Sequence, residues 1–492
     1  MNILLLCPEF PDTFWSYKHA LKFVGCRATQ PPLGLLTVAA LLPPHWGKRL
    51  VDLNVTRLTP SDLAWADYAF IGGMVVQRAS ALRLIARCRA AGVPIVAGGP
   101  LFTSEPGAWP GVDHLVLNEA EITLPLFLAD LERGQARRVY ATNEFADLRA
   151  SPSPLWELAD LRRYSLMGVQ YSRGCPFQCD FCNVTTLFGR RPRTKSAAQF
   201  IAELTGLRRA HWRGPVFVVD DNLIANRRSL REELLPALIQ WQQGSPKTPF
   251  NTQVSIDLAD DPSLMAMMVQ AGFGTVFVGI ETPDEQRLVE CGKRQNAHRD
   301  LAADVRRMQR AGLEVQGGFI VGFDGDTPLV FQKQLDFIQH SGIVTAMVGM
   351  LQALAGTRLH ERLSREGRIR GSGSGDNVDG STNIVPTMGL AALQQGYRQL
   401  LRQLYSPKPY YQRIRTFLRE YGSPATRVRL TFRNLVAFGR SVLKLGVLGK
   451  ERLPYWKLLV WTALRRPSLL AQAISLAICG HHYRKVCEMH IL

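Results

Sequence analysis

The 492-residue sequence predicts an α/β protein with an N-terminal open, doubly wound sheet, a following partial (β/α) barrel and a helical C-terminal region. Three observations predict this architecture. Short apolar runs alternate with stretches of helical periodicity in two separate parts of the chain. A stretch rich in proline and serine lies between the two parts, and the Gly/Ser-only segment 371–375 interrupts the second alternation.

The first part contains five short apolar runs, as expected for buried parallel strands. They lie at residues 2–7, 49–53, 68–72, 94–97 and 114–117, and residues 78–91 between them have helical periodicity. In an open α/β sheet, ligands bind at the carboxyl ends of the strands, where glycine lets the backbone approach the ligand. The candidate turns are Pro31-Pro32-Leu33-Gly34, Gly72-Gly73-Met74 and Gly98-Gly99-Pro100. Tight turns alone would explain each of them, whereas together they predict a flat ligand at one sheet edge.

The second part repeats βα units, which is typical of a barrel or partial barrel. Strand-like runs at 216–219, 275–279 and 318–321 alternate with helical stretches at 197–209, 264–270 and 301–309. We therefore divide the chain into an N-terminal domain (1–145), a linker (146–160), a core domain (161–370), a helical extension (371–426) and a basic amphipathic helical tail (427–492).

The composition indicates a folded protein in a reducing compartment. Hydrophobic residues make up 46% of the chain and charged residues 20%, which excludes extended disorder. The nine cysteines are scattered apart from one triplet, unlike a disulfide framework. The chain begins with an apolar strand rather than a basic leader, and charged residues or proline interrupt every long apolar window. We therefore expect a cytoplasmic protein that does not span a membrane.

The strongest local motif is Cys175-Pro-Phe-Gln-Cys179-Asp-Phe-Cys182. Three thiolates in one short loop suit three irons of a [4Fe-4S] cluster, whose fourth iron then stays open to a substrate or cofactor. The alternative is a structural zinc site, which needs a fourth ligand, commonly in a second Cys or His pair. No such pair follows at a useful spacing. The triplet therefore predicts a cluster rather than zinc.

This motif resembles the signature of the radical S-adenosylmethionine (SAM) superfamily, Cys-x-x-x-Cys-x-Φ-Cys, with Phe181 as the aromatic residue. The resemblance implies that the open iron chelates SAM and that one electron yields a 5′-deoxyadenosyl radical. It implies that Phe181 lies near the adenine. The other implied SAM residues are Asp221 and Asn222 (where Asp220-Asp221-Asn222 replaces the usual Gly-Gly-Glu), the ribose carboxylate Glu281, and Gly318 and Gly322 beside the adenine. A helix cap or solvated loop is the alternative for each carboxylate, and no catalytic residue is assigned.

Residues 1–410 resemble the cobalamin-binding branch of that superfamily, in the glycine-rich turns above and in Asn118-Glu119-Ala120-Glu121. That resemblance implies a cobalamin site formed by Pro32, Gly34, Gly72, Gly73, Gly98, Gly99 and Glu119. Some cobalamin domains coordinate cobalt through an Asp-x-His-x-x-Gly loop. The corresponding stretch here is Asp52-Leu53-Asn54-Val55-Thr56, which lacks the histidine. We therefore expect cobalamin without a protein histidine on cobalt, with His19 and His45 as spare candidates.

The chain is most similar to enzymes related to the hopanoid C-2 methyltransferases, through Gln170-Tyr171-Ser172-Arg173-Gly174-Cys175, Val219-Asp220-Asp221-Asn222 and Gly279-Ile280-Glu281-Thr282-Pro283. This resemblance implies methylation of an unactivated carbon of a hydrophobic or lipid-like small molecule, with an electron donor such as flavodoxin or ferredoxin. The same machinery could instead form a carbon–carbon bond, close a ring or rearrange its substrate without net methylation.

Two other classes are less well supported. A tRNA methylthiotransferase should carry a second three-cysteine set in its leading domain, and Cys7, Cys26 and Cys88 lack that spacing. An iron–sulfur electron carrier seldom needs so long a chain or an open iron.

The basic residues predict a membrane contact. The formal net charge is +18, and from Arg427 onward twelve Lys and Arg stand against Glu451 and Glu488. Basic amphipathic helices with Tyr455, Trp456 and Trp461 are typical of a membrane interface. We therefore expect peripheral contact with the inner membrane face and no nucleic acid partner. A helical cap packed on the barrel is the alternative, and both could hold.

Overall fold

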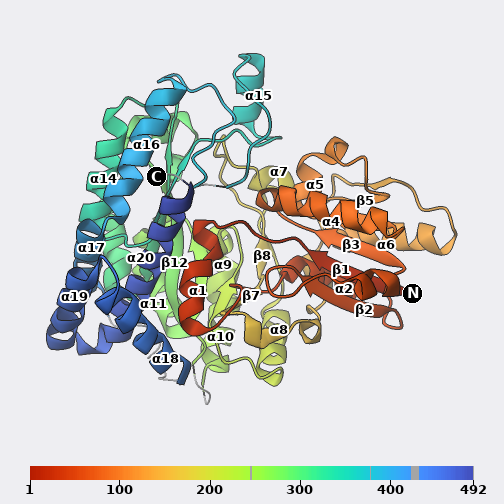
Figure 1. Cartoon of the computed structure of the whole chain (residues 1–492), viewed down its shortest axis with the longest axis horizontal. Coiled ribbons are helices and arrows are strands. Elements are labelled where there is room, and N and C mark those ends of the chain that lie inside the picture. The colour runs from red at the N-terminus through yellow and green to blue at the C-terminus, as the bar shows by residue number, and fades with distance from the viewer. Residues whose placement is uncertain (244–246, 377, 423–431, 491–492) are drawn as a thin grey trace.

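Two six-stranded parallel sheets form the centre of the protein, as seen in a computed structural model that describes residues 1–243, 247–376, 378–422 and 432–490 (Figure 1). The first sheet has the order β2-β1-β3-β4-β5-β6. Its strands are β1 (Asn2–Cys7), β2 (Gly47–Asp52), β3 (Tyr68–Gly72), β4 (Ile95–Gly98), β5 (His114–Val116) and β6 (Val139–Tyr140). The strand order reverses between β1 and β3, as in a doubly wound fold. The predicted N-terminal fold class is confirmed.

Helices cover both faces of this sheet, which explains why its strands are apolar on both sides. Leu4, Leu6 and Ile71 pack in one core with α3 (Pro60–Trp65), α4 (Arg78–Ala90) and α5 (Pro100–Ser104). Ile3 and Leu5 face the other core, with α2 (Leu33–Leu41) and α6 (Ala120–Glu132). The N-terminal domain therefore has two apolar cores of its own.

The second sheet is an open, partial barrel in which the strands follow one another in chain order. Its strands are β7 (Met167–Val169), β10 (Val216–Val218), β11 (Phe250–Val254), β12 (Phe273–Glu281), β13 (Glu314–Val321) and β14 (Ala346–Met350). The helices between them are α8 (Ala197–Arg209), α10 (Leu235–Trp241), α11 (Pro262–Ala271), α13 (Leu301–Arg310) and α14 (Leu329–Ser341). Two short strands, β8 (Ser172–Arg173) and β9 (Arg193–Thr194), pair antiparallel beside it. The predicted partial barrel is confirmed.

Every predicted strand and helix is present in the structure, with ends that shift by a few residues. The strands without a prediction are β6, β7, β8, β9, β11 and β14. β11 was difficult to predict because Asn251 and Gln253 alternate with buried residues, so its sequence is not an apolar run.

The expected linker has more structure than its composition indicates. Within 146–160 the chain forms short 3₁₀ helices at Leu148–Ala150 and Trp156–Leu158, and Trp156 is buried in the barrel core. The expected boundary at residues 426 and 427 lies outside the described residues.

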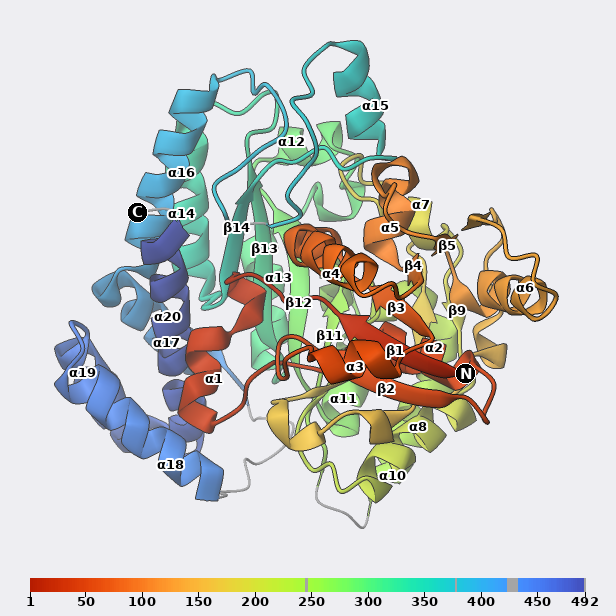
Figure 2. The ribbon, with the colours of Figure 1, turned by 45° about the vertical axis from the view of Figure 1, so that its right-hand side comes forward.

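Except for the first, which packs against Phe323 and Leu351 through Leu359 and Leu363, the C-terminal helices pack around α14 and β14, directly or through one another. They are α15 (Arg358–Arg365), α16 (Leu390–Tyr405), α17 (Pro407–Glu420), α18 (Phe432–Ser441), the π-helix η11 (Val442–Val447), α19 (Arg452–Arg465) and α20 (Leu470–His490). An N-terminal segment, with the 3₁₀ helix η1 (Phe14–Ser16) and α1 (Lys18–Val24), leaves its own domain and packs against α18 and α20 (Figure 2). Within the described part of the chain, none of the helices is both long and apolar enough to cross a membrane.

Candidate active site

The carboxyl ends of the barrel strands bring the predicted SAM residues to one edge of the sheet. The cysteine loop follows β8, Asp221 follows β10, Glu281 ends β12 and Gly322 follows β13. Because the six strands are parallel, these ends meet on the same side of the barrel. Residues that are up to 147 positions apart, from Cys175 to Gly322, are thus gathered around one region.

The cysteine loop begins with a glycine that no other residue could replace without strain. Gly174 has a φ of +98°, and a Cβ added to it would lie 2.9 to 3.1 Å from the carbonyl oxygens of Arg191, Gly189 and Phe188. Beyond it, the Cys175 amide donates to the Gly189 carbonyl (3.3 Å) and the Asp180 amide donates to the Cys291 carbonyl (3.0 Å). The loop is therefore fixed at its start and in its middle by neighbouring backbone.

The three thiols suit a cluster rather than a single ion. Cys175, Cys179 and Cys182 are free and half-buried. Burial raises the pKa of all three thiols, that of Cys182 to about 12, and the nearby Lys293 ammonium counteracts the rise. Among the described residues, no three His, Cys, Asp or Glu side chains are arranged to hold one metal ion. A [4Fe-4S] cluster does not need that arrangement because each thiolate binds its own iron, so this donor set fits the cluster.

Glu281 forms a buried ion pair that the sequence did not reveal. Its carboxylate lies 2.7 Å from the Lys293 ammonium, and Glu281 itself has a φ of +65°. Although burial opposes the charge, this carboxylate raises the pKa of Lys293. A Cβ on Gly279 would lie 2.3 Å from the Glu281 carboxylate and 2.8 Å from the Lys293 ammonium, so the pair needs glycine there. A positive charge is thus held beside the cysteine loop.

The structure distinguishes the three residues that replace Gly-Gly-Glu. Asp220 accepts hydrogen bonds from the Tyr171 amide (2.8 Å) and from the Ser172 amide and hydroxyl (2.7 and 2.6 Å), and therefore holds the strand before the cysteines. Asn222 exchanges hydrogen bonds with Ser255 after β11. Asp221 is approached by backbone N–H groups and by the charge of Arg173, and burial raises its pKa to about 6. Asp221 has the greater freedom to meet a ligand, whereas Asn222 joins two loops.

The predicted adenine residues lie among aromatic rings. Phe181 packs edge-on against Phe323, with ring centroids 6.2 Å apart. Gly322, the neighbour of Phe323, has a φ of +102°, which favours glycine. A Cβ on Gly318 would lie 2.8 Å from the Phe277 ring. The structure therefore shows why glycine stands at both positions, and their contact with SAM stays a prediction.

The inner face of the barrel carries almost no charge. Strand register places Phe217, Asn251, Thr275 and Glu314 in one row across β10 to β13. The next row contains Gln253, Phe277 and Gln316. All of these except Glu314 are half-buried, whereas the alternate residues Val276, Val278 and Ile280 are fully buried in the helix-covered core. The accessible face is thus lined by aromatic rings and uncharged amides.

The N-terminal segment reaches this inner face. Trp15 packs edge-on against Phe277, with ring centroids 5.2 Å apart. Glu314, at the start of β13, is buried and hydrogen-bonds to Gln472 of α20. Burial raises the pKa of Glu314 to about 7. The face is therefore bounded by η1 and α20 at the ends of the strands opposite the cysteine loop.

The glycines at the carboxyl edge of the first sheet differ in how closely other residues surround them. A Cβ on Gly72 would lie 2.9 Å from Leu35, and one on Gly98 would lie 2.4 Å from the Val116 carbonyl oxygen, so internal packing alone requires both. A Cβ on Gly34 would meet nothing within 4 Å, and Gly73 makes ordinary contacts only. The backbone at Gly34 is thus open to approach at the edge expected for cobalamin, whereas a Cβ on Gly73 would meet Gln77, Pro8 and Leu101. Gly99 has a φ of +87°, and Pro32 precedes α2.

No histidine of the N-terminal domain lies at that edge. Asn54, which replaces the missing histidine, donates to the Pro8 carbonyl (3.2 Å) and to Asp52 (2.6 Å), and accepts from the Phe10 amide (2.8 Å). His45 lies before β2, at the amino ends of the strands, and His19 lies on α1 beside His482. The arrangement fits a cobalamin that is bound without a protein histidine on cobalt.

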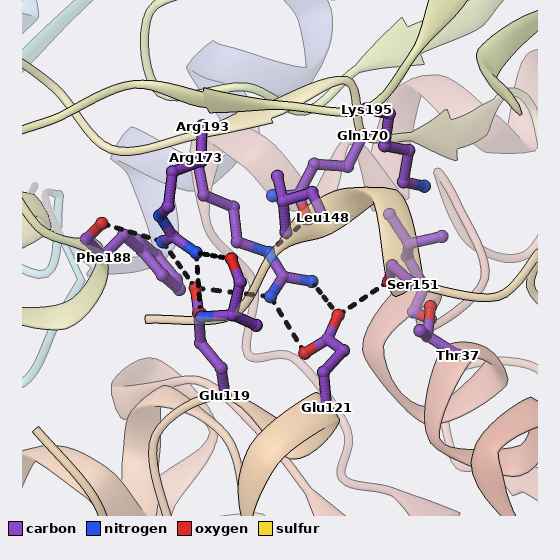
Figure 3. Close-up of polar contacts among 12 residues, drawn as sticks. Thr37, Glu119, Glu121, Leu148, Ser151, Gln170, Arg173, Phe188, Arg193 and Lys195 are labelled. Atoms are coloured by element: carbon purple, nitrogen blue, oxygen red, sulfur yellow. Dashed lines mark hydrogen bonds and ion pairs between the residues drawn. The ribbon is translucent and has the colours of Figure 1, made fainter. Parts of the chain in front are cut away.

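The motif Asn118-Glu119-Ala120-Glu121 joins the N-terminal domain to the short strands β8 and β9, on either side of the cysteine loop (Figure 3). Arg173 donates two hydrogen bonds to Glu121 (3.0 and 2.8 Å), and Arg193 donates two to Glu119 (2.8 and 2.7 Å). Although burial opposes it, the hydrogen bonds and charge of Arg173 lower the pKa of Glu121 to about 2. We call these four residues the interdomain clamp. Both oxygens of Glu119 are engaged, so this predicted cobalamin residue also holds the domain against the cysteine loop.

The cysteines of the N-terminal domain form no second cluster site. Cys7 ends β1, Cys26 follows α1 and Cys88 lies in α4, and all three are buried and free. This placement gives no support to the methylthiotransferase alternative.

Comparisons with known proteins agree with this geometry. Residues 169–338 match the model of the radical SAM superfamily, and residues 357–491 match a domain of unknown function, DUF4070. An uncharacterised methyltransferase of Synechocystis sp. is 40% identical over 100% of this chain and 93% of its own. The hopanoid C-2 methylase of Rhodopseudomonas palustris is 32% identical over 98% of this chain and 92% of its own.

Solved structures share the fold at low sequence identity. The cobalamin-dependent SAM radical enzyme OxsB, solved with aqua-cobalamin and SAM, has a TM-score of 0.61 and 14% identity, covering 99% of this chain and 80% of its own. The radical SAM methyltransferase TsrM of Kitasatospora setae, solved with cobalamin and a [4Fe-4S] cluster, has a TM-score of 0.58 and 14% identity, covering 75% and 79%. Both therefore share the overall fold of this chain.

Proposed function

The chain belongs to the radical SAM methyltransferases related to hopanoid C-2 methylase, and we propose that it methylates an unactivated carbon of a hydrophobic or lipid-like small molecule. When bound, the [4Fe-4S] cluster, SAM and cobalamin supply the electron, the hydrogen-abstracting radical and the methyl group. Cys175, Cys179 and Cys182 hold the cluster in this proposal. An electron donor such as flavodoxin or ferredoxin provides the reducing equivalent.

The remaining roles follow from the surroundings of each residue. Asp221 and Glu281 present carboxylates at the edge where SAM binds, with Lys293 neutralising the second. Phe181 and Gly318 border the adenine, and the backbone at Gly34 borders cobalamin. The interdomain clamp keeps the two cofactor regions in a fixed relation, because its arginines come from the segments that flank the cysteine loop.

The observation that carries the substrate class is the inner face of the barrel, where only Glu314 of the seven side chains in the two rows can carry a charge. Phe217, Phe277 and Trp15 offer apolar surface, and Asn251, Gln253 and Gln316 offer hydrogen bonds without formal charge. A charged substrate would lose hydration there without gaining an ion pair. A neutral, largely apolar molecule with a few hydroxyl groups could pack against the aromatic rings and form hydrogen bonds with the amides. The identity to hopanoid C-2 methylase, an enzyme named for a lipid substrate, supports the same class.

The test is the fate of a labelled methyl group. Anaerobic, reconstituted enzyme is incubated with cobalamin, a reductant, a neutral lipid extract and SAM labelled in its methyl carbon. The expected result is a labelled, methylated lipid together with 5′-deoxyadenosine. Formation of 5′-deoxyadenosine with an unlabelled, rearranged product would establish the reaction without net methylation instead.

Two variants separate cofactor binding from substrate binding. Cys179→Ala should remove the cluster absorption and all SAM cleavage. Phe277→Ala should keep the cluster spectrum but lower kcat/KM at least tenfold, because it removes aromatic surface from the inner face. A Phe277→Ala enzyme with unchanged kcat/KM would show that the substrate lies elsewhere.

A further inference from the structure

Exposed apolar side chains are concentrated on the outer C-terminal helices. Among the described residues, ten of the twenty-two exposed large hydrophobic side chains lie between residues 432 and 464. Phe432 is 80% exposed, Leu448 74% and Leu464 77%. Apolar surface gathered in this way usually marks an interaction site. We call these ten residues the outer C-terminal surface: Phe432, Leu435, Phe438, Leu443, Val447, Leu448, Leu453, Trp456, Val460 and Leu464.

The exposed residues follow helical spacing, so they form one face rather than scattered points. The four in α19 are separated by three, four and four positions: Leu453, Trp456, Val460 and Leu464. The opposite face of α19 is buried where this helix packs on α17 and α20. α19 is thus apolar on both sides, and the protein itself covers one of them.

The outer C-terminal surface lies at the periphery of the molecule. In Figures 1 and 2, α18 and α19 form an outer edge, on the side of the barrel away from the N-terminal sheet. α17 and α20 pack between α19 and the barrel. The surface is therefore available to a large, flat partner.

Its charge is strongly positive. Residues 432–466 contain eight Lys and Arg and one acidic residue, Glu451. Glu451 is buried and pairs with Arg484. Although burial opposes it, a hydrogen bond from His481 and the charge of Arg484 lower the pKa of Glu451 to about 2. Lys450, Arg452, Lys457 and Arg465 are exposed beside the apolar residues. An anionic partner with an apolar interior complements this combination.

We propose that the outer C-terminal surface docks the enzyme on the anionic face of a lipid bilayer. Seven of its ten residues are Leu or Val, which add buried apolar area in a bilayer but would not stack on RNA bases. A second copy of the chain would bring two positively charged surfaces together, which is unfavourable. A bilayer with anionic lipids offers an apolar interior to the aliphatic side chains and negative charge to the cationic ones.

The docking surface goes beyond the proposed function and does not depend on it. It would place the enzyme at the leaflet that is rich in anionic lipid, which in a cytoplasmic protein is the inner face of the membrane. α18 also holds the N-terminal segment, because Arg440 donates to the carbonyls of Lys22 (2.9 Å) and Phe23 (3.1 Å). That segment continues back to Trp15 at the barrel face.

Flotation with vesicles tests the surface directly. The full-length enzyme is mixed with vesicles of phosphatidylcholine alone or with added phosphatidylglycerol, at low and high salt. We expect flotation with the anionic vesicles that weakens severalfold, without vanishing, as salt rises. The double variant Leu448→Glu/Leu464→Glu should lower the partition coefficient at least tenfold. The matched control is Leu82→Glu/Leu329→Glu, which changes exposed leucines in α4 and α14 and should float like the unaltered enzyme.

Four outcomes would overturn the proposal. The unaltered enzyme could stay off anionic vesicles, or both double variants could float equally well. Light scattering could instead show a dimer that Leu448→Glu/Leu464→Glu dissociates, which would assign the surface to self-association. Tight tRNA binding that competes with the vesicles and collapses with salt would assign it to nucleic acid. None of these results bears on methyl transfer, so the two proposals fail separately.

Discussion

The N-terminal domain and the C-terminal helices both pack against the barrel, but through different chemistry. The C-terminal helices share one continuous apolar core with the barrel strands. At its centre the Phe14 ring lies 5.2 Å from that of Tyr405 and 4.9 Å from that of Tyr483. The N-terminal domain keeps two cores of its own, and only a few of its sheet-domain side chains, such as Leu36 and Val55, reach the barrel core.

Ion pairs make up much of the N-terminal contact. The interdomain clamp joins β8 and β9 to the segment after β5. Tyr164 also donates to the buried Asp52 at 2.9 Å. We therefore expect the C-terminal helices to unfold together with the barrel. The N-terminal domain is instead a separately folded domain, which its contacts with the barrel hold in place.

The largest effect is expected where the cores are continuous. Phe14→Ala should lower the free energy of unfolding of the barrel by about 4 kcal/mol, because it leaves a cavity among packed aromatic rings. Urea denaturation followed by tyrosine and tryptophan signals measures this. Phe432→Ala, at an exposed phenylalanine, is the control and should change it by less than about 0.5 kcal/mol. A small effect of Phe14→Ala would mean that the N-terminal segment contributes little to the core that the barrel and the C-terminal helices share.

A somewhat smaller effect is expected at the interdomain clamp. Glu121→Gln should destabilise the attachment of the N-terminal domain by about 3 kcal/mol, because the buried charge of Arg173 loses the carboxylate that accepts two of its hydrogen bonds and keeps only the longer ion pair with Glu119 (3.4 Å). Hydrogen exchange should rise across the interface while α20 stays protected. Adding Arg173→Met should restore part of the loss, since both charges are then gone. The exposed pair Arg228 and Glu232 should show a coupling of only about 0.4 kcal/mol.

The two interfaces should also respond to pH in opposite directions. Glu121 has a folded-state pKa of about 2, below its usual value, so its stabilisation is present above about pH 4.5 and is lost as pH falls toward 2. Glu314 has a folded-state pKa of about 7, so the folded state holds an extra proton, and stability is lost as pH rises from about 4.5 to 7. Each of these pKa changes corresponds to roughly 3 kcal/mol.

Urea midpoints across this pH range separate the two contributions. Glu314→Gln should remove the decline between about pH 4.5 and 7 and exceed the unaltered protein in stability above pH 7. Glu121→Gln should remove only the decline at lower pH. If Glu314→Gln keeps the full decline, another group near the C-terminal interface is responsible.

The smallest effect is expected for histidine variants in the two regions, which test whether either region supplies a protein ligand to cobalt. His45→Ala in the N-terminal domain and His19→Ala beside the C-terminal helices should both leave the cob(II)alamin electron paramagnetic resonance spectrum unchanged. Neither histidine lies at the carboxyl edge of the first sheet. The unaltered enzyme should show no nitrogen splitting from a protein ligand. Splitting that disappears in either variant would contradict binding without histidine.

The sequence by itself determined the parts that depend on neighbours in the chain. The cysteine triplet occupies a single loop, and an apolar run flanked by turns predicts a buried parallel strand without knowledge of its partner. Both sheets and the cluster residues could therefore be predicted. The strand β11 could not, because its polar residues Asn251 and Gln253 line the inner face instead of a core.

Only the tertiary structure decided which charges meet. Glu119 and Arg193 are 74 positions apart, Glu281 and Lys293 lie on either side of a helix, and Trp15 reaches a strand that begins at Phe273. Nothing local distinguishes these side chains from other charged or aromatic residues in the chain, because ion pairing and ring packing depend on distances that folding creates. For the same reason the sequence showed a basic, amphipathic tail, whereas the fold decided which of its faces the protein covers and which it leaves exposed.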